Sequence, residues 1–413
     1  MDISIKRKGD LMKMCREVVL VDGARSAFGK RGGMFKNIDA LDLGAHVLRG
    51  LIEKTDILNR TKVDDVFVGS AYSDAISNAA GRYIVLASGL PEDVSGTYIE
   101  MQCGSAITAL NYAAYKIAMG GADVIFAGGV ESHSRKIVKF PTWLDSYKFQ
   151  APAALPVKFG PEDWMNTLMP YNSDLMAKEW DIARSACDEY ALRSQEGMAR
   201  AIQSGFTGPE IIPYIIPATK KTPELILNKD EHPRPNMTMD MLTSLRPIYE
   251  GGVTTAGNSS GVNDGASFIL LMSAEKAKEC GYTPYARWVY GASEGCKPNL
   301  MGIGASYSNL KALKALGMKL SDIDVWESNE AFAAQILSCI KDMETKTGEK
   351  IDMNKFNPNG GAIAIGHPNG ASGTRITWWA MKQLEKTGGR YGCISSCCGG
   401  GQGSTAIIEN LRR

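Results

Sequence analysis

The feature that most constrains the fold of this 413-residue chain is an order of apolar runs and helical segments that occurs twice. Short apolar runs bounded by turn residues are typical of buried strands, and apolar residues spaced three or four apart are typical of helices. In the first half these patterns predict strands at 18–21, 63–69 and 123–129 and helices at 40–54 and from 103 to about 120. In the second half they predict strands at 286–291, 322–327 and 391–395 and helices at 310–316 and from about 371 to 388. The repeated order predicts an internally duplicated α/β fold, with helices joining parallel strands that are buried on both faces.

Residues 131–251 lie between the two halves and are less regular, with many prolines and one long polar helix at 180–204. We expect this region to be an inserted loop subdomain and its helix to be exposed. Insertions of this size often cover a functional site. The rest of the chain then divides into a first half, 1–130 completed by 252–280, and a second half, 281–413.

Composition excludes several classes of protein. The chain has 46 lysines and arginines against 45 aspartates and glutamates, so nothing favours nucleic acid or an anionic membrane as a partner. No apolar run approaches the roughly 18 residues of a transmembrane helix. No apolar stretch follows the basic residues at 6–8, so we expect no secretory signal. Nine scattered cysteines do not form the pattern of a disulfide framework, which indicates a cytoplasmic protein in a reducing compartment.

Cys103 begins a predicted helix and is followed by Gly104, Ser105 and Ala106. A helix N-terminus carries roughly half a positive elementary charge, which favours a thiolate over a thiol. The small residues that follow would let an acyl group reach the sulfur. Taken alone, the same cysteine could be an inert side chain packed in the core.

His367 has the most restrictive surroundings of the four histidines, because it lies between a glycine and Pro368 at a predicted strand-to-helix turn. Pro368 suits the first turn of a helix. His46 lies in an amphipathic helix and should be structural, whereas His133 and His232 lie in polar stretches that we expect to be exposed. An imidazole at the position of His367 could be a catalytic base or a capping residue.

Cys397 precedes Cys398 and three glycines at 399–401. Glycines allow backbone N–H groups to converge on a negatively charged oxygen, as in an oxyanion hole, although a plain tight turn is the alternative. No third and fourth ligand at suitable spacing accompanies the two cysteines, so we expect no zinc or other metal site.

Asn329 and Glu330 directly follow the predicted strand at 322–327. An amide and a carboxylate at a strand end are well placed to hold a water molecule or to orient another catalytic group. The alternative is the N-terminal cap of the helix that follows.

Taken together, these segments resemble the motifs of the thiolases, the coenzyme A-dependent acyltransferases that make or cleave 3-oxoacyl-CoA. The resemblance runs from Val18 to Asn410 and is carried by residues 23–30, 103–105, 127–132, 255–265, 329–333, 360–368 and 397–403. It implies a duplicated five-layered αβαβα fold with an inserted loop subdomain, in agreement with the duplication predicted above. It also implies a homodimer or homotetramer that acts in fatty acid metabolism.

The resemblance implies a role for each matching residue. Cys103 would be the nucleophile that becomes acylated, and His367 would take its proton. Cys397 would be the acid or base that moves the proton at the α-carbon of the second acyl-CoA. Asn329 would hold a water that forms one oxyanion hole with His367, and the backbone N–H groups of Cys103 and Gly399 would form the other.

The resemblance further implies that coenzyme A, acetyl-CoA and other acyl-CoA esters are substrates and that no cofactor stays bound. The positions that line the coenzyme A path in the family correspond to Tyr249, Ala256, Ser260 and Phe332.

Several residues depart from the usual family pattern. Glu100 stands where asparagine is usual, three residues before the nucleophile, and Asn369 stands where leucine is common after His-Pro. Cys398 replaces an apolar residue, Ala106 replaces a residue that is often glycine, and the loop at 169–174 matches only loosely. Because these positions surround the acyl pocket, they bear on the identity of the acyl group more than on the reaction.

Two other functions remain as alternatives. One is a decarboxylating ketoacyl synthase, which the presence of Cys397 and the low number of histidines disfavour. The other is a catalytically silent acyl-CoA-binding protein, which the intact set of four reactive residues disfavours. The three thiols of Cys103, Cys397 and Cys398 also suggest that oxidation could form an inactivating disulfide.

Overall fold

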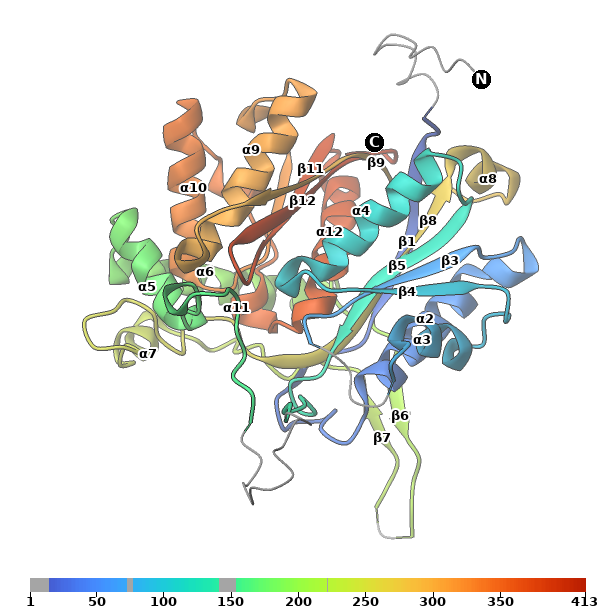
Figure 1. Cartoon of the computed structure of the whole chain (residues 1–413), viewed down its shortest axis with the longest axis horizontal. Coiled ribbons are helices and arrows are strands. Elements are labelled where there is room, and N and C mark those ends of the chain that lie inside the picture. Colours follow the sequence, from blue (N-terminus) through green and yellow to red (C-terminus); the bar gives the residue numbers. More distant parts are fainter. Residues whose placement is uncertain (1–14, 73–76, 141–153, 221) are drawn as a thin grey trace, which may run out of the picture.

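A computed structural model describes residues 15–72, 77–140, 154–220 and 222–413. At its centre is a mixed β-sheet with the strand order β10-β11-β12-β9-β1-β8-β5-β3-β4 (Figure 1). The strands are β1 (Val18–Arg25), β3 (Asp65–Gly69), β4 (Ser95–Ile99), β5 (Val124–Glu131), β8 (Asn263–Ser273), β9 (Ala286–Gly295), β10 (Val325–Ser328), β11 (Tyr391–Cys398) and β12 (Gln402–Asn410), and the short β2 (Gly29–Lys30) pairs with β8. The helices outside the insertion are α2 (Ala40–Thr55), α3 (Ala80–Ser88), α4 (Ser105–Ala118), α8 (Ala274–Glu279), α9 (Gly304–Leu316), α10 (Ala333–Thr347), α11 (Ala362–Ile365) and α12 (Asn369–Thr387).

The pairing of the strands confirms the duplication. In the first half, β3 is parallel to β5, while β8 is antiparallel to both β5 and β1. In the second half, β10 is parallel to β11, while β12 is antiparallel to both β11 and β9. The halves meet where β1 pairs with β9. The sequence predicts parallel strands joined by helices, whereas β8 and β12 run antiparallel to their neighbours. Strand β12 does so because only residues 399–401 separate it from β11.

The helices form three layers around the two halves of the sheet (Figure 1). Helices α4 and α12 pack against each other and against strands of both halves, so they form a central layer. Helices α2 and α3 cover the outer face of the first half, and α9 and α10 cover that of the second. This arrangement confirms the five layers implied by the family resemblance. None of the helices in the described ranges is both long and apolar enough to cross a membrane.

The insertion contains the helices α5 (Met169–Glu179), α6 (Arg184–Gln203) and α7 (Met239–Thr243) and a two-stranded ribbon of β6 (Tyr214–Ile216) and β7 (Leu225–Leu227), which projects from the body of the molecule in Figure 1. The prediction of an exposed helix at 180–204 is wrong for one face of α6, where Tyr190 and Met198 are buried. The polar residues on that face suggest exposure in the sequence, but they are buried with hydrogen-bond partners. Asp188, for example, accepts a hydrogen bond from Asn258 at 2.9 Å.

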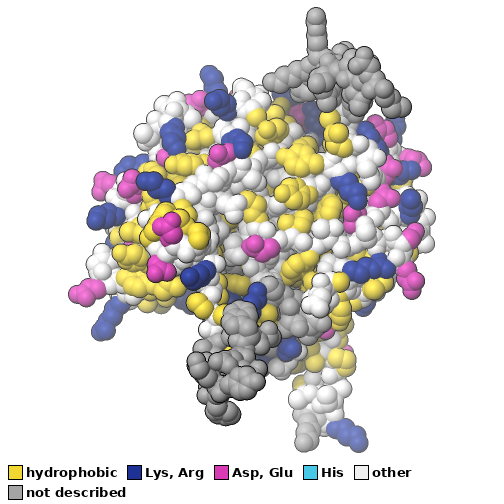
Figure 2. Space-filling model, in the orientation of Figure 1, with side chains coloured by type: hydrophobic (Ala, Val, Ile, Leu, Met, Phe, Trp, Pro, Cys, Tyr) yellow, Lys and Arg dark blue, Asp and Glu magenta, His cyan; other side chains and the backbone are white. Residues whose placement is uncertain are grey.

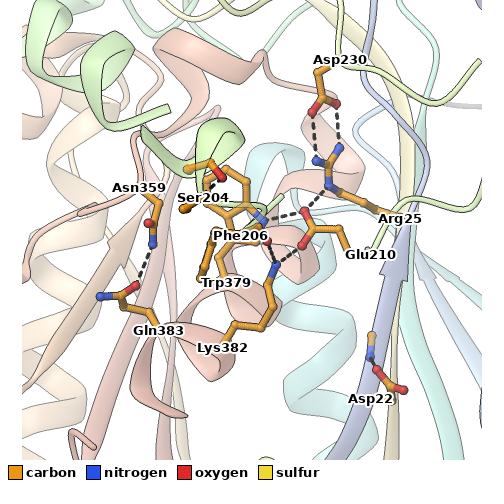
Figure 3. A network of polar contacts seen from close by, with 12 residues as sticks. Asp22, Arg25, Ser204, Phe206, Glu210, Asp230, Asn359, Trp379, Lys382 and Gln383 are labelled. Carbon is orange, nitrogen blue, oxygen red and sulfur yellow. Dashed lines mark hydrogen bonds and ion pairs between the residues drawn. The ribbon is translucent and has the colours of Figure 1, made fainter. Parts of the chain in front are cut away.

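A buried network of charged side chains joins the insertion to β1 and α12 (Figure 3). Arg25 lies 2.7 Å from Glu210 and 2.7 Å from Asp230. Glu210 also accepts a hydrogen bond from Trp379 at 2.9 Å and contacts the Lys382 amine. Burial alone would raise the pKa of Glu210, but the charges of Arg25 and Lys382 and the hydrogen bonds lower it to about 2. Burial lowers the pKa of Lys382 even beside this carboxylate. The charge of Arg25 lowers the pKa of Glu210 more than the charge of Lys382 does.

We expect Glu210→Gln to lower the free energy of unfolding by roughly 3–5 kcal/mol at pH 7, because the change leaves buried cations without their carboxylate. The pKa of about 2 lies below the ordinary value of 4.5, so the contribution of Glu210 is complete above about pH 4.5 and is lost as the pH falls towards 2. Urea titrations of both proteins at several pH values should show the difference shrinking across that window.

The matched control is Glu92→Gln at an exposed position, which should change stability by less than about 0.5 kcal/mol. A destabilisation by Glu210→Gln that stays constant from pH 7 to pH 3 would contradict the charge argument.

Candidate active site

Cys103 lies where the chain turns from β4 into α4, as the sequence predicts. A single 3-10 turn, Gln102–Gly104, precedes the helix, and Gln102 has a left-handed φ of 48° that residues other than glycine adopt rarely. Glu100 holds this turn, because its Oε1 accepts hydrogen bonds from the Gln102 backbone N–H at 2.8 Å and side-chain amide at 2.6 Å. The unusual residue at 100 therefore shapes the loop that presents Cys103.

The Cys103 sulfur is surrounded by hydrogen-bond donors but is also deeply buried. Asn369 donates from Nδ2 to the sulfur at 3.1 Å, and the backbone N–H groups of Cys103 and Gly399 lie near enough to lower the pKa of the thiol. Burial nevertheless raises the pKa of Cys103 to about 11, although these donors lower it in part. Burial therefore outweighs the helix N-terminus, which was expected to favour a thiolate. The resting group is a thiol, and the reaction must remove its proton.

Cys397 and Cys398 end β11, and their side chains point to opposite faces of the strand. Burial raises the pKa of the Cys397 thiol well above its ordinary value, and the nearby Cys103 raises it further. The sulfur of Cys398 packs against Gly104, where a side chain would come within 2.4 Å of it. All nine cysteines are free thiols, so the suggested disulfide stays a prediction.

The turn between β11 and β12 needs its glycines. Gly400 and Gly401 have φ values of 87° and 90°, which only glycine adopts without strain. At Gly399 a side chain would lie 3.0 Å from the Phe159 ring. Phe159 belongs to the insertion, so the insertion reaches the turn that carries the Gly399 N–H.

His367 is held in one tautomer by its neighbours. The Ser372 hydroxyl donates to the Pro368 carbonyl at 3.0 Å, so His367 Nδ1–H donates to Ser372 Oγ at 2.7 Å. His367 Nε2 then carries the lone pair and accepts from Asn329 Nδ2 at 3.3 Å. Burial lowers the pKa of His367 to about 3, with help from His133 and Arg375, so the ring is neutral. No hydrogen bond between His367 and Cys103 occurs in the described part of the chain.

Asn329 and Glu330 follow the end of β10, and their side chains have different surroundings. Asn329 is fully buried, and its Oδ1 has no hydrogen-bond partner among the described residues. Glu330 accepts hydrogen bonds from Tyr190 at 2.9 Å and Ser194 at 2.7 Å, both on α6. The amide therefore remains a site residue, whereas the carboxylate anchors the insertion.

Sequence reasoning missed His133, which was expected to be exposed. The residue is only 8% exposed, its Nε2 lies 2.6 Å from Asn369 Oδ1, and its ring meets the Tyr72 ring edge to face at 5.4 Å. The available signal was its place just beyond β5. Because β3, β4 and β5 are parallel, their carboxyl ends meet at one edge of the sheet, and Cys103 follows β4.

Glu131 is a second residue that the sequence analysis left without a role. Its buried carboxylate accepts hydrogen bonds from the backbone N–H groups of Ala71 and Gly370, each at 2.9 Å. Burial raises the pKa of Glu131 to about 7, although these donors lower it in part. The carboxyl group thereby ties the start of α12 to the edge of the first-half sheet, next to Cys103.

The four residues expected along a coenzyme A path lie on two neighbouring segments. Ser260 N–H donates to the Ala331 carbonyl at 2.9 Å, and Ser259 pairs with Phe332, so the loop at 256–260 lies beside Phe332. Ala256 is exposed at this loop. Tyr249 stands at the turn that leads into it and packs edge to face on Tyr171 at 5.4 Å.

Comparisons with known proteins agree with this geometry. Residues 18–275 match the thiolase N-terminal domain, and residues 282–410 match the thiolase C-terminal domain. The chain is 38% identical to the β-ketoadipyl-CoA thiolase of Pseudomonas aeruginosa and 38% identical to the acetyl-CoA acetyltransferase of Thiocystis violacea, and each match covers 96% of this chain and 100% of the relative. The crystal structure of human mitochondrial 3-ketoacyl-CoA thiolase superimposes with a TM-score of 0.87 at 32% identity, over 96% of this chain and 100% of the other. The matches confirm the resemblance and the fold that were inferred from the sequence.

Proposed function

The chain belongs to the thiolase family and is a coenzyme A-dependent acyltransferase that cleaves or forms 3-oxoacyl-CoA, and we propose that Cys103 is the nucleophile of this reaction. The observation that carries the proposal is the hydrogen bond from Asn369 Nδ2 to the Cys103 sulfur, together with the backbone N–H groups of Cys103 and Gly399 that lower the pKa of this thiol. An inert core cysteine has no need of N–H groups brought near its sulfur from two distant segments.

In the cleavage direction, the Cys103 sulfur attacks the 3-oxo carbon of the substrate, and its proton passes to His367 Nε2. That nitrogen carries a lone pair because the ring proton lies on Nδ1 and is donated to Ser372, and the lone pair must exchange the Asn329 N–H for the Cys103 proton. The bond between C2 and C3 then breaks, leaving an acyl group on the sulfur and the enolate of acetyl-CoA. Coenzyme A next attacks the acyl group and restores the Cys103 thiol, so one difficult step becomes two easier ones.

Two oxyanion holes support these steps. The backbone N–H groups of Cys103 and Gly399 would hold the oxygen of the group bound to the sulfur, and their lowering effect on the pKa of the Cys103 thiol supports this role. Asn329, with a water, and His367 would hold the enolate oxygen. The unpartnered Oδ1 of Asn329 supports a bound water, since a buried amide oxygen without a partner is costly. One donor of such a hole typically accounts for roughly a 100- to 1,000-fold effect on rate.

Cys397 would protonate the enolate carbon in cleavage and remove the same proton in condensation. Burial raises the pKa of its thiol, so Cys397 stays protonated near neutral pH and carries the proton that the enolate carbon takes up. The rigid pairing of β11 with β10 and β12 keeps Cys397 fixed relative to Asn329, because the two strands that carry them are neighbours.

The remaining assignments are also proposals. Tyr249, Ala256, Ser260 and Phe332 would line the coenzyme A path. The first half would be residues 1–130 with 252–280, the loop subdomain 131–251 and the second half 281–413. The chain would act in the cytoplasm, in fatty acid metabolism.

We propose that the protein is a homodimer or homotetramer. Hydrophobic side chains gather over the middle of the face shown in Figure 2, where Figure 1 places α4. Tyr112 and Tyr115 of that helix and Met119, which follows it, are exposed. Apolar groups gathered on a surface favour contact with another protein. Light scattering on the purified protein would give the number of subunits.

A thiolysis assay tests the proposed function. With coenzyme A present, 3-oxoacyl-CoA esters should be cleaved and acetyl-CoA released, and we expect the rate to depend on the length, branching and terminal charge of the acyl chain. Esters of graded length, with and without a terminal carboxylate, would define the preferred substrate. The carboxylate series matters because one relative is a β-ketoadipyl-CoA thiolase. Consumption of malonyl-CoA with release of carbon dioxide, without any thiolysis, would contradict the proposal.

A further inference from the structure

Three side chains from separate segments form a hydrogen-bonded series that ends on the nucleophile. Asn369, at the start of α12, donates to the Cys103 sulfur at 3.1 Å. Its other amide atom, Oδ1, lies 2.6 Å from Nε2 of His133, which follows β5. The roles proposed above for His367, Cys397 and Asn329 make no use of this series.

The chemistry of the amide fixes the direction of the two hydrogen bonds. An amide oxygen can only accept, so His133 must carry its proton on Nε2 and donate it to Asn369. With its oxygen held in this way, the amide presents its N–H to the sulfur. A thiolate accepts such a hydrogen bond strongly because it is charged. The opposite orientation would place the amide oxygen against the sulfur and would favour the protonated thiol.

His133 is itself held in place. Its ring packs edge to face against Tyr72, and it is 8% exposed. Burial lowers the pKa of His133, and the charges that face it are Lys136 and Arg31, which lower the pKa, and Asp264, which raises it. The ring is therefore neutral near pH 7, with one proton to donate.

The series provides a hydrogen bond to the Cys103 sulfur that His367 does not provide. Burial opposes a charge on the Cys103 sulfur, and the neutral His367 makes no hydrogen bond to it in the described residues. Asn369 is the side chain that donates to this sulfur. Leucine, which is common at this position in the family, has no N–H to donate.

We propose that Asn369 and His133 act as a positioning pair that stabilises the Cys103 thiolate, with His133 fixing the orientation of the Asn369 amide. The inference rests on the proposed role of Cys103 as the nucleophile. It concerns both half-reactions, since the thiolate attacks in the first and leaves in the second.

Alkylation of Cys103 by iodoacetamide, followed by mass spectrometry of its peptide over a range of pH, reports the thiolate directly and needs no turnover. We expect Asn369→Leu to raise the apparent pKa of Cys103 by roughly 1–2 units, as expected for the loss of a hydrogen bond to a charged group. Alkylation at pH 8 should slow by roughly 10- to 100-fold. The half-exposed thiol of Cys280, followed in the same samples, serves as the internal reference and should be unaffected.

Two substitutions at His133 distinguish its role in orienting the Asn369 amide from its role in packing. His133→Leu should shift the Cys103 profile in the same direction by a smaller amount, because the amide is then free to turn. His133→Gln, which restores an N–H donor, should recover most of the shift. The double variant Asn369→Leu/His133→Leu should be no worse than Asn369→Leu alone, since His133 acts only through the amide.

An unchanged Cys103 profile in Asn369→Leu would overturn the proposal, and so would additive effects in the double variant. Failure of the proposed function is recognised separately. In that case the wild-type protein shows no thiolysis of any 3-oxoacyl-CoA ester, whatever the alkylation profiles are. The other titratable groups near the sulfur, Glu131, Tyr72, Cys397 and Cys398, are present in every variant, so the comparison isolates the amide.

Discussion

Replacing Cys103 with alanine is expected to reduce thiolysis by roughly 10⁴-fold or more, because the covalent route to the products is lost. The loss of activity should appear as a lower kcat. Binding of acyl-CoA should change little, since the residues proposed to line the coenzyme A path, Ala256, Ser260 and Phe332, are unchanged. Rates of thiolysis and calorimetric binding of acetyl-CoA, measured on the same preparations, would separate the two effects.

Mass spectrometry adds a direct readout of the acyl-enzyme. Wild-type protein mixed with acetyl-CoA should carry an acetyl group on the Cys103 peptide, and Cys103→Ala should carry none at any cysteine. The matched control is Cys280→Ala, at a half-exposed thiol, which should retain activity within about twofold. An alanine variant at 103 that keeps more than about one per cent of the rate would remove Cys103 from the mechanism.

Cys397→Ala is expected to separate the two half-reactions. Transfer of an acetyl group from acetyl-CoA to Cys103 needs no proton transfer at carbon, so it should survive. Condensation and cleavage of a carbon–carbon bond should fall by roughly 100- to 10,000-fold, as expected for the loss of a general acid or base. Exchange of the α-protons of acetyl-CoA with deuterated water should be lost to the same extent.

Cys398→Ala is the matched control for this prediction, because the neighbouring thiol packs against Gly104 on the other face of β11. We expect its loss of activity to stay below about tenfold. Equal losses in the two variants, or loss of acetyl transfer in Cys397→Ala, would contradict the role proposed for Cys397.

Much of the fold could be predicted from the sequence because each strand and helix is specified locally. The apolar run that becomes β5 and the helical spacing of α2 are visible in short windows. The order of these apolar and helical segments predicts the duplication, and the strands of the two halves pair in the same order. The antiparallel strands β8 and β12 were harder, because nothing within a strand specifies the direction of its neighbour.

The site could be predicted only where a local motif marks it. Cys103 and His367 stand out because small residues and turns surround them. His133 does not, since its partner Asn369 is 236 residues away and its neighbours in the chain are polar. Glu330 shows the opposite case, because a motif suggested a catalytic carboxylate but the residue is committed to α6. In both cases, contacts between distant segments override the local pattern.

Helices α4 and α12 occupy equivalent places in the two halves, and Cys103 and Asn369 stand at their beginnings. The Cys103 sulfur and the Asn369 amide thus belong to different copies of the repeat, and they come into contact where the two copies pack together. A shift of one copy against the other by a fraction of an ångström would lengthen the hydrogen bond at the sulfur while leaving each copy folded. The rate of turnover therefore depends on how the two halves pack against each other. A substitution that disturbs this packing should lower the rate before it lowers the free energy of unfolding.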